Sequence, residues 1–324
     1  MISIIRKYQI LICFFVAVVI ARFLPSPGVE MSNLGFLNFF IIVIFLCIGL
    51  TFDRKKIKNI FSKKITTALL WTLIASAFLS PLIAYLISTE MGFKPDTLIG
   101  IVLICASTPT LVAGPIMASQ MGGNFEISTA FSAIVKILGI FLIPIVLVTF
   151  LGSIAKINQI TLILEMIYLI IIPGFAGQGI RMLCENSIKK FYKGINWLVI
   201  LSNFALAYIA FSCMHNQLCQ ITLSTVLVLL GPCLIVHLLH ILITSQFGKH
   251  ILRLPRDINI SVVITACQKN MAVPLSIWAI VFAKTYPGAI LTVVIYYLVQ
   301  FFFDSCLLSL TGFKNKKLSS SDIA

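Results

Sequence analysis

Charged residues are scarce in this sequence: Asp, Glu, Lys and Arg make up 10% of the 324 residues, and only 10 residues are acidic. Hydrophobic residues make up 60% of the chain, and the mean hydropathy is +1.08. A soluble domain of this size cannot hide so much apolar surface in one core. The composition therefore predicts an all-α integral membrane protein with many spans.

Signatures of hydrolytic chemistry are missing as well. The sequence has no H-E-x-x-H, P-loop or G-x-S-x-G pattern and no pair of intramembrane aspartates, which disfavours an intramembrane enzyme. Its nine cysteines form no C-x-x-C pair and no metal-ligand spacing, so no cofactor and no metal site is expected. Cys213 and Cys219 are the only conceivable external disulfide.

Long apolar segments recur along the whole chain. A membrane-spanning helix needs about 20 apolar residues to cross a hydrocarbon core of about 30 Å. Ten segments meet this requirement approximately: residues 9–24, 34–50, 65–87, 97–120, 124–151, 159–180, 194–214, 221–243, 258–283 and 288–310. We number them 1 to 10 and predict ten transmembrane helices.

The lysines and arginines are distributed unequally between alternate loops. With ten spans, 18 of the 24 basic residues fall on one side of the membrane and four on the other, while Lys136 and Lys269 lie within segments. This is the positive-inside pattern, and it places both termini in the cytoplasm. The net charge of +14 therefore indicates a contact with the lipid bilayer and no nucleic acid. Short loops and many lysines and isoleucines fit a bacterial inner membrane.

The segments divide into two sets of five, residues 1–151 and 159–313, followed by a tail at 314–324. Because each half has an odd number of segments, the second half enters the membrane from the opposite side, as in many secondary transporters. Segments 4 and 9 occupy corresponding positions and both are interrupted, by Pro109-Thr110 with Gly114-Pro115 and by Gln268-Lys269-Asn270. Paired broken helices indicate a transport site at the membrane midplane.

Several stretches, in order along nearly the whole chain, resemble the bile acid:sodium symporter superfamily, and the SBF-like branch in particular. They are Phe23-Leu24-Pro25, Ile48-Gly49-Leu50-Thr51, Cys105 to Thr110, Gly122-Gly123-Asn124, Ser128 to Gly139 with Pro144, and Gln268 to Pro274. The resemblance implies an inverted-repeat fold with a panel domain of segments 1, 2, 6 and 7 and a core domain of segments 3–5 and 8–10. It also implies that helices 4 and 9 cross and that an organic anion binds beside the crossing.

In sodium-coupled members of that family, polar groups on the fourth, fifth and ninth helices hold the ion. Carried onto this sequence, the matching positions that keep a polar side chain are Ser128, Ser132 and Gln268, which we regard as vestigial sodium ligands. The ninth-helix glutamate is replaced by Ile264, and the polar pair of the fourth helix by Gly114 and Pro115. The resemblance thus implies transport without establishing sodium as the coupling ion.

Two lysines and one aspartate within the segments are candidate functional residues. Ser128, Ser132 and Lys136 are spaced by four and share one face of segment 5. Our hypothesis is that Lys136, together with Lys269, supplies positive charge that sodium supplies elsewhere, and either lysine could also exchange a proton. Asp304 in segment 10 is expected to pair with one lysine, in a neutralising or a proton-carrying role.

Other polar residues are expected to have structural roles. We interpret Glu126 as a helix-start residue after the Asn124 cap, and His237 with His240 as donors of interhelical hydrogen bonds. The full candidate site consists of Thr108, Pro109, Thr110, Gly114, Ser128, Ser132, Lys136, Thr265, Gln268, Lys269, Asn270 and Asp304.

The sequence therefore predicts a secondary active transporter of a small organic anion that works by alternating access, with a proton or sodium as the coupling ion. Two alternatives within transport remain open, a sodium-coupled bile-acid-type symporter and a proton-linked cation exchanger. A receptor with a Schiff base on Lys269 is disfavoured by the ten spans and the broken helix. The oligomeric state is not predicted.

Overall fold

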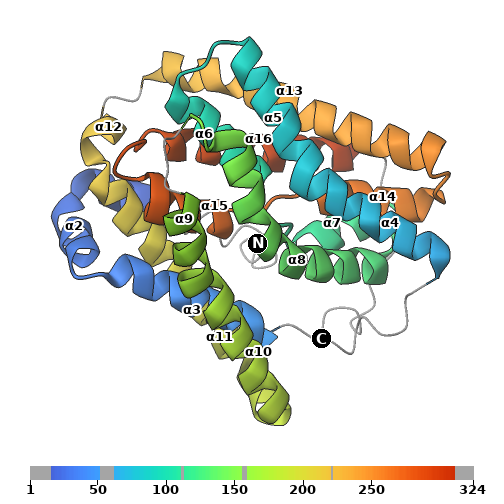
Figure 1. The fold of residues 1–324 in the computed structure, drawn as a ribbon, viewed down its shortest axis with the longest axis horizontal. Helices are drawn as coiled ribbons and strands as arrows, with labels where there is room; N and C mark the ends of the chain where they lie inside the picture. Colours follow the sequence, from blue (N-terminus) through green and yellow to red (C-terminus); the bar gives the residue numbers. More distant parts are fainter. Residues whose placement is uncertain (1–15, 52–61, 111–112, 155–158, 220–221, 311–324) are drawn as a thin grey trace.

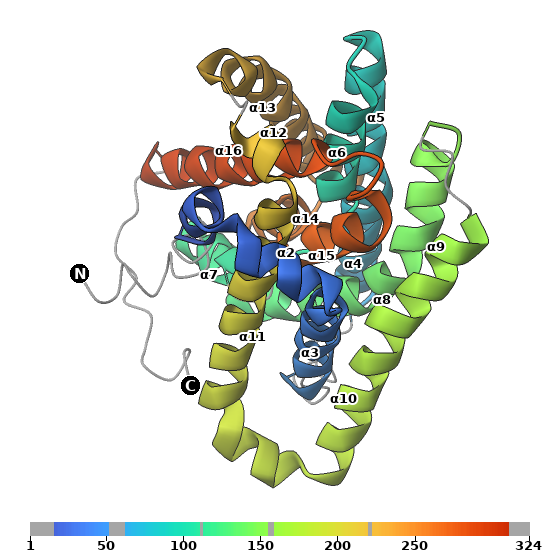
Figure 2. The ribbon, with the colours of Figure 1, turned by 90° about the vertical axis from the view of Figure 1, so that its left-hand side faces the viewer.

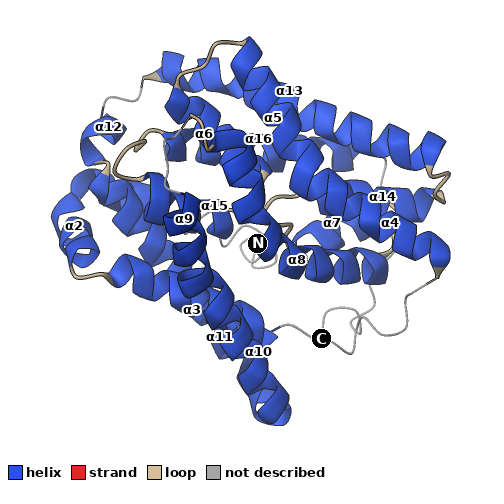
Figure 3. Cartoon of the chain, in the orientation of Figure 1, coloured by secondary structure: helices blue, strands red, loops and turns tan. Residues whose placement is uncertain are grey.

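The computed structural model describes residues 16–51, 62–110, 113–154, 159–219 and 222–310. Within these ranges the chain is helical and contains no strand (Figure 3); the single β-like feature is one isolated bridge between Pro109 and Lys269. This confirms the expected all-α fold for the described part of the chain.

The helices follow one another closely along the chain. In order, they are residues 16–23, α2 Pro25–Asn33, α3 Phe36–Thr51, α4 Lys63–Ile74, η2 Ala75–Leu79, α5 Ser80–Glu90, α6 Pro95–Cys105, α7 Ala113–Gln120, α8 Phe125–Leu151, α9 Gln159–Met166, η3 Ile167–Ile171, α10 Ile172–Leu183, α11 Glu185–Cys213, α12 His215–Cys219, α13 Leu223–Gln246, η4 Phe247–Ile251, α14 Arg256–Cys267, α15 Ala272–Ile277, η5 Trp278–Phe282 and α16 Ala289–Leu310. The η elements are π-helical turns within longer helices.

Where the structure describes the predicted segments they are mostly helical, with segments 4 and 9 interrupted, and fewer than ten described helices are long enough to span alone. Five described helices have sufficient length and apolar composition to cross a membrane, and there are up to seven if each bent pair is one span. Pro95–Cys105 and Ala272–Phe282 are apolar but shorter, because segments 4 and 9 are broken. The multi-span character is confirmed, and the count of ten stays a prediction.

Helix starts follow from capping side chains and prolines. Asn124 precedes α8 and its side-chain oxygen accepts a hydrogen bond from the backbone N–H of Ile127 at 3.0 Å, as expected for an N-cap. Glu126 is exposed in the first turn of α8 and therefore suits the positive end of the helix dipole. The preceding tight turn depends on Gly122, which has a φ of 89° that residues with a Cβ rarely adopt.

The structure contains one helix, α2, that the sequence did not predict as a separate element. The first helix ends at Phe23, as the Phe23-Leu24-Pro25 stretch predicts, and Pro25 then begins α2. Helices α2 and α3 meet at an angle of 79°. Proline at a first helical position has no N–H to lose to the helix, which explains why a new helix starts there.

The helices form two groups (Figures 1 and 2). One group consists of α2, α3, α10 and α11, which pack mainly on each other; the other contains α4 to α8 and α13, α14 and α16, with α14 packed against α4, α7, α8 and α13. In the first group, α3 and α10 approach at glycines: a Cβ on Gly49 would collide with the backbone of Gly174, and one on Gly177 with that of Leu46. The glycines of segment 6 therefore allow close helix packing.

Helix α8 is bent by 61° between Phe125–Gly139 and Phe141–Leu151. Pro144 lies inside this helix and its ring clashes with the backbone one turn earlier, which places the bend immediately after Gly139. The first half of α8 packs beside the broken helices, so this bend shapes the surroundings of the site.

Candidate functional site

The breaks of segments 4 and 9 lie against each other and are joined by backbone hydrogen bonds. The N–H of Thr110 donates to the carbonyl of Gln268 at 3.0 Å, and the N–H of Asn270 donates to that of Thr108 at 2.8 Å. Between these bonds, Pro109 and Lys269 form the antiparallel bridge. Two short extended segments thus satisfy each other's backbone groups where helical bonds are absent. We call this arrangement the crossing, residues 107–110 and 268–270.

The crossing also supplies matching caps for the half-helices that leave it. The Thr110 hydroxyl accepts a hydrogen bond from the N–H of Gly114 at 2.9 Å, at the start of α7. The Asn270 side-chain oxygen accepts one from the N–H of Ala272 at 3.0 Å, at the start of α15. Both breaks therefore end in the same way, with a polar side chain that caps the next half-helix.

Lys269 is completely buried, and its ammonium is held by oxygen atoms from two other segments. It donates to the backbone oxygen of Ser76 at 2.7 Å, to the Ser76 hydroxyl at 3.0 Å and to the backbone oxygen of Ser107 at 3.4 Å. Ser76 lies in the π-helical turn η2, where the wider turn exposes carbonyls that a regular helix would use internally. No described carboxylate contacts this ammonium, so its ligands are neutral oxygens.

A continuous set of buried polar side chains extends from Lys269 to α16 and α13. The Gln300 side-chain oxygen accepts from the backbone N–H of Lys269 at 2.9 Å, and its amide donates to the Gln268 side-chain oxygen at 3.3 Å. The Gln268 amide donates to one carboxylate oxygen of Asp304. The other carboxylate oxygen lies 3.0 Å from the Nε2 atom of His237.

The expectation that Asp304 pairs with a lysine is wrong. Its two oxygens are used by His237 and Gln268, which lie on other helices, and neither Lys136 nor Lys269 reaches it. A sequence cannot show this partner, because it depends on the rotation of α13 against α16. Both histidines of α13 do make interhelical hydrogen bonds, as predicted, since His240 Nε2 lies 2.9 Å from the Ala75 backbone oxygen.

The serine face of α8 meets the ninth segment on the other side of the crossing. The hydroxyls of Ser128 and Thr265 lie 2.8 Å apart. Ser132 and Lys136 continue the same face and are buried, and the Ser132 hydroxyl has no hydrogen-bonding partner among the described residues. Lys136 as a whole is 5% exposed, so most of its side chain is covered by protein.

Thr108 approaches α8 one turn beyond Lys136. A Cβ on Gly139 would lie 2.7 Å from the Thr108 side-chain methyl, so only glycine permits this approach. The Thr108 hydroxyl itself is buried without a hydrogen-bonding partner among the described residues. The crossing can therefore pack closely against α8 because Gly139 has no side chain.

The positions that would complete a sodium site are apolar. Ile264 is 3% exposed and packs with Met117 and Ala118, next to the Gly114-Pro115 start of α7. Gln268, the remaining amide, contacts the Met117 sulfur at 3.5 Å as well as Asp304. Among the described residues, no group of three His, Cys, Asp or Glu could hold a metal ion.

The sequence did not predict two residues of the site, Ser76 and Gln300. Gln300 is an uncharged amide within an apolar segment, which is a usable signal, whereas Ser76 is one of many small hydroxyl residues. Cys213 and Cys219, considered as a disulfide, are both free thiols, and the Cys219 sulfur lies 3.5 Å from His215 Nε2.

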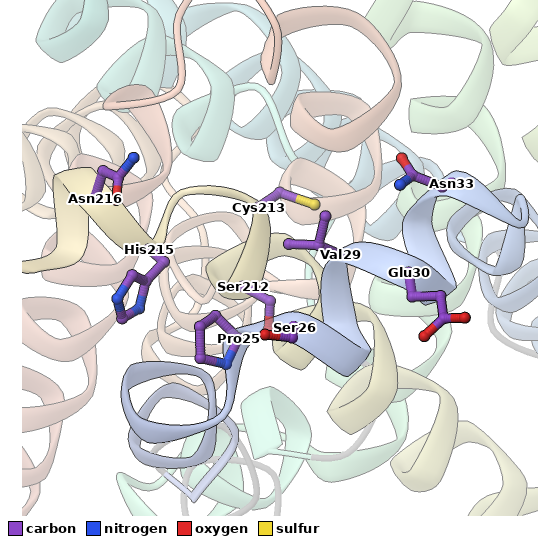
Figure 4. A pocket seen from close by; sticks show the side chains of 9 residues that line it. All are labelled: Pro25, Ser26, Val29, Glu30, Asn33, Ser212, Cys213, His215 and Asn216. Carbon is purple, nitrogen blue, oxygen red and sulfur yellow. The ribbon is translucent and has the colours of Figure 1, made fainter.

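Two cavities open away from the crossing. One of about 450 Å³ lies between α2 and the end of α11 and is lined by Glu30, Ser212, Cys213 and His215 among others (Figure 4). The other, of about 390 Å³, is lined by Asn38, Glu165 and Tyr168 together with Ala279 and Ile280 of η5. Neither lining includes a residue of the crossing.

Broken helices that pair inside a polytopic apolar protein are typical of membrane transporters. The chain belongs to the SBF-like CPA transporter family, whose model matches residues 8–311. It is also similar to two rice proteins, from Oryza sativa subsp. indica and subsp. japonica, each described as "Probable sodium/metabolite cotransporter BASS4, chloroplastic". Each match is 27% identical over 140 residues, which is 43% of this chain and 33% of the relative. The matched region thus spans about a third of these relatives.

Proposed function

We propose that the protein is a secondary active transporter that moves a small organic anion by alternating access. In this proposal it has ten transmembrane helices in two inverted repeats, residues 1–151 and 159–313, with the tail 314–324 and both termini in the cytoplasm. The observation that carries the proposal is the antiparallel pairing of the two breaks, at Pro109 and Lys269. The mutual packing of α3, α10 and α11 supports a panel domain of the kind that the resemblance implies.

An anion is the substrate class that the local electrostatics favour. The starts of α7 and α15 direct the positive ends of two half-helices toward the crossing, and Lys269 adds a buried ammonium. A second buried ammonium, Lys136, lies on the face of α8 that continues from Ser128. The two ammonium groups thus favour an anion, while the Asp304 carboxylate is engaged by His237 and Gln268.

Lys269 replaces a bound cation in this proposal. Three neutral oxygens surround its ammonium at 2.7 to 3.4 Å, so the positive charge lies among oxygen atoms. The family's sodium positions, in contrast, carry Ile264, Gly114 and Pro115. We therefore propose transport without sodium, with a proton as the coupling ion.

Uptake into proteoliposomes tests the proposal. Thermal-shift screening of the purified protein against organic monoanions, with and without sodium, selects the anion that stabilises it most. Radiolabelled uptake of that anion should proceed equally in sodium chloride and choline chloride. Strict sodium dependence would favour a sodium symporter, the activity named for the rice relatives. A pH change driven by sodium without any organic anion would favour a cation exchanger.

The membrane location and the orientation of the protein are part of the same proposal. We propose a bacterial inner membrane as its location, because the basic loops would face an anionic cytoplasmic leaflet. Cysteine accessibility at Lys94→Cys and Lys249→Cys, which lie at predicted opposite sides, tests the orientation in intact cells. Labelling of both positions from the same side would contradict it.

A further inference from the structure

The pair His237 and Asp304 is buried within the core group and is connected to the crossing. His237 is 0% and Asp304 1% exposed, and Nε2 of the imidazole lies 3.0 Å from one carboxylate oxygen. The other carboxylate oxygen accepts from Gln268, the first residue of the crossing's second break. A conformational change at the crossing therefore acts directly on the carboxylate that faces His237.

The second imidazole nitrogen of His237 is an unused proton acceptor. A carboxylate accepts hydrogen bonds only, so the proton of the neutral ring lies on Nε2 and Nδ1 carries a lone pair. Nδ1 is buried and has no hydrogen-bonding partner in the described structure. The rings of Tyr296 and Phe303 lie edge-on to the imidazole, with centroids 5.9 Å away in both cases. The site thus leaves one buried basic nitrogen beside a fixed negative charge.

Other groups around the pair set its electrostatic surroundings. The titratable groups near the pair, on neighbouring elements and on α13 itself, are Tyr296, Cys267, Cys105, Lys269, Cys233 and His240. The π-helical turn η2 has no titratable residue, while Tyr85 of α5 packs on Phe150 and Glu90 is exposed at the end of α5. Within this set Lys269 opposes a second positive charge, and Asp304, which touches the imidazole, favours it.

We propose that His237, positioned by Asp304, binds the coupling proton of the transport cycle. This inference rests on the proposed function and adds the site of the coupling ion. A proton added to Nδ1 gives an imidazolium that pairs with the Asp304 carboxylate, and the proton leaves from the same atom when the site opens to the other side. One bound anion and one bound proton together leave the net charge of the core unchanged, so the loaded and empty carriers meet the same electrical barrier.

Two assays on the same proteoliposomes separate coupling from transport itself. Exchange of labelled against unlabelled anion at equal pH needs binding and alternating access but no net proton movement. Uphill uptake in sodium-free buffer with an acidic exterior needs the coupling proton. The probe is taurocholate, or the other monovalent organic anion that the thermal-shift screen selects.

The variants are Asp304→Asn and His237→Gln, in which an amide keeps the hydrogen-bonding shape of the pair, with His250→Gln as the control because His250 is exposed. We expect both pair variants to lose uphill uptake by about tenfold or more, and by a larger factor than they lose exchange, with the control unchanged in both assays. His237→Gln retains a donor toward Asp304, so it serves as the measurement if Asp304→Asn folds poorly.

Each other result has a definite meaning. Uphill uptake at the wild-type rate in both folded variants would overturn the proton site. Equal loss of exchange and of uphill uptake would also overturn it, because the pair would then take part in substrate binding. Exchange without any pH-driven uptake in the wild-type protein would overturn the proton site alone. Absence of exchange in the wild-type protein for every anion that stabilises it would overturn the proposed function.

Discussion

The ammonium of Lys269 lies 2.7 Å from the backbone oxygen of Ser76, a residue 193 positions earlier in the chain. The contact joins the π-helical turn of segment 3 to the break of segment 9, and no described carboxylate takes part in it. A buried ammonium held by neutral oxygens keeps its charge available to an anion. This relationship is the basis of the first prediction.

Lys269→Met should abolish most anion uptake while changing stability little. The loss of a charge-assisted interaction of about 1.4 kcal/mol corresponds to about tenfold lower uptake. The change in unfolding free energy should be about 1 kcal/mol or less, because the lost hydrogen bonds and the relieved burial of a charge oppose each other. Uptake and denaturant unfolding measure the two effects, with the exposed Lys249→Met as control. Unchanged uptake would show that the charge does not serve the anion.

The two caps of the crossing should have equal structural roles. Thr110→Val and Asn270→Ala each remove the side-chain acceptor of a half-helix, so each should lower the unfolding free energy by about 1 kcal/mol. Asn270→Asp retains an acceptor and is the matched control. Thermal unfolding in detergent provides the measurement, and stability equal to wild type in Asn270→Ala would contradict the capping role.

Gly139→Ala should destabilise the protein by forcing Thr108 away from α8. The added Cβ would meet the Thr108 methyl at 2.7 Å, and such overpacking costs about 1 to 3 kcal/mol. The second-site change Thr108→Ser removes that methyl and should restore part of the loss. A double-mutant cycle measured by unfolding tests the contact, and strictly additive effects would count against it.

Transport of a monovalent anion with one proton should not respond to the membrane potential. A moving elementary charge gains about 2.3 kcal/mol per 100 mV, so even one unbalanced charge would change accumulation strongly. Potassium gradients with valinomycin set the potential in proteoliposomes at a constant pH gradient. We expect equal accumulation at either sign of the potential, and a difference of about tenfold or more would show net charge movement.

Much of the site could be read from local sequence. Prolines and polar residues inside apolar segments identified both breaks: Pro109 lacks a backbone N–H for a helical hydrogen bond, and Gln268 to Asn270 are polar within an apolar segment. The spacing of Ser128, Ser132 and Lys136 placed them on one helix face for a similarly local reason. The Asn124 cap and the Gly122 turn were predictable from their immediate neighbours.

The partners of these groups were not predictable in the same way. Asp304 was expected to meet a lysine because opposite charges attract, yet the rotation of α13 and α16 brings His237 to it instead. Ser76 acquires its role only because η2 turns a carbonyl toward Lys269. Contacts between segments depend on how entire helices pack, and no short stretch of sequence records this.

The sequence alone determined that this chain enters a membrane repeatedly and where its helices break, since both follow from hydropathy and backbone chemistry within one segment. The tertiary structure decided that the breaks pair with each other and that Lys269 is held by Ser76 and Ser107. It also decided that His237 shares Asp304 with Gln268. The physical reason is that buried polar groups take whichever partner the helix packing brings within hydrogen-bonding distance.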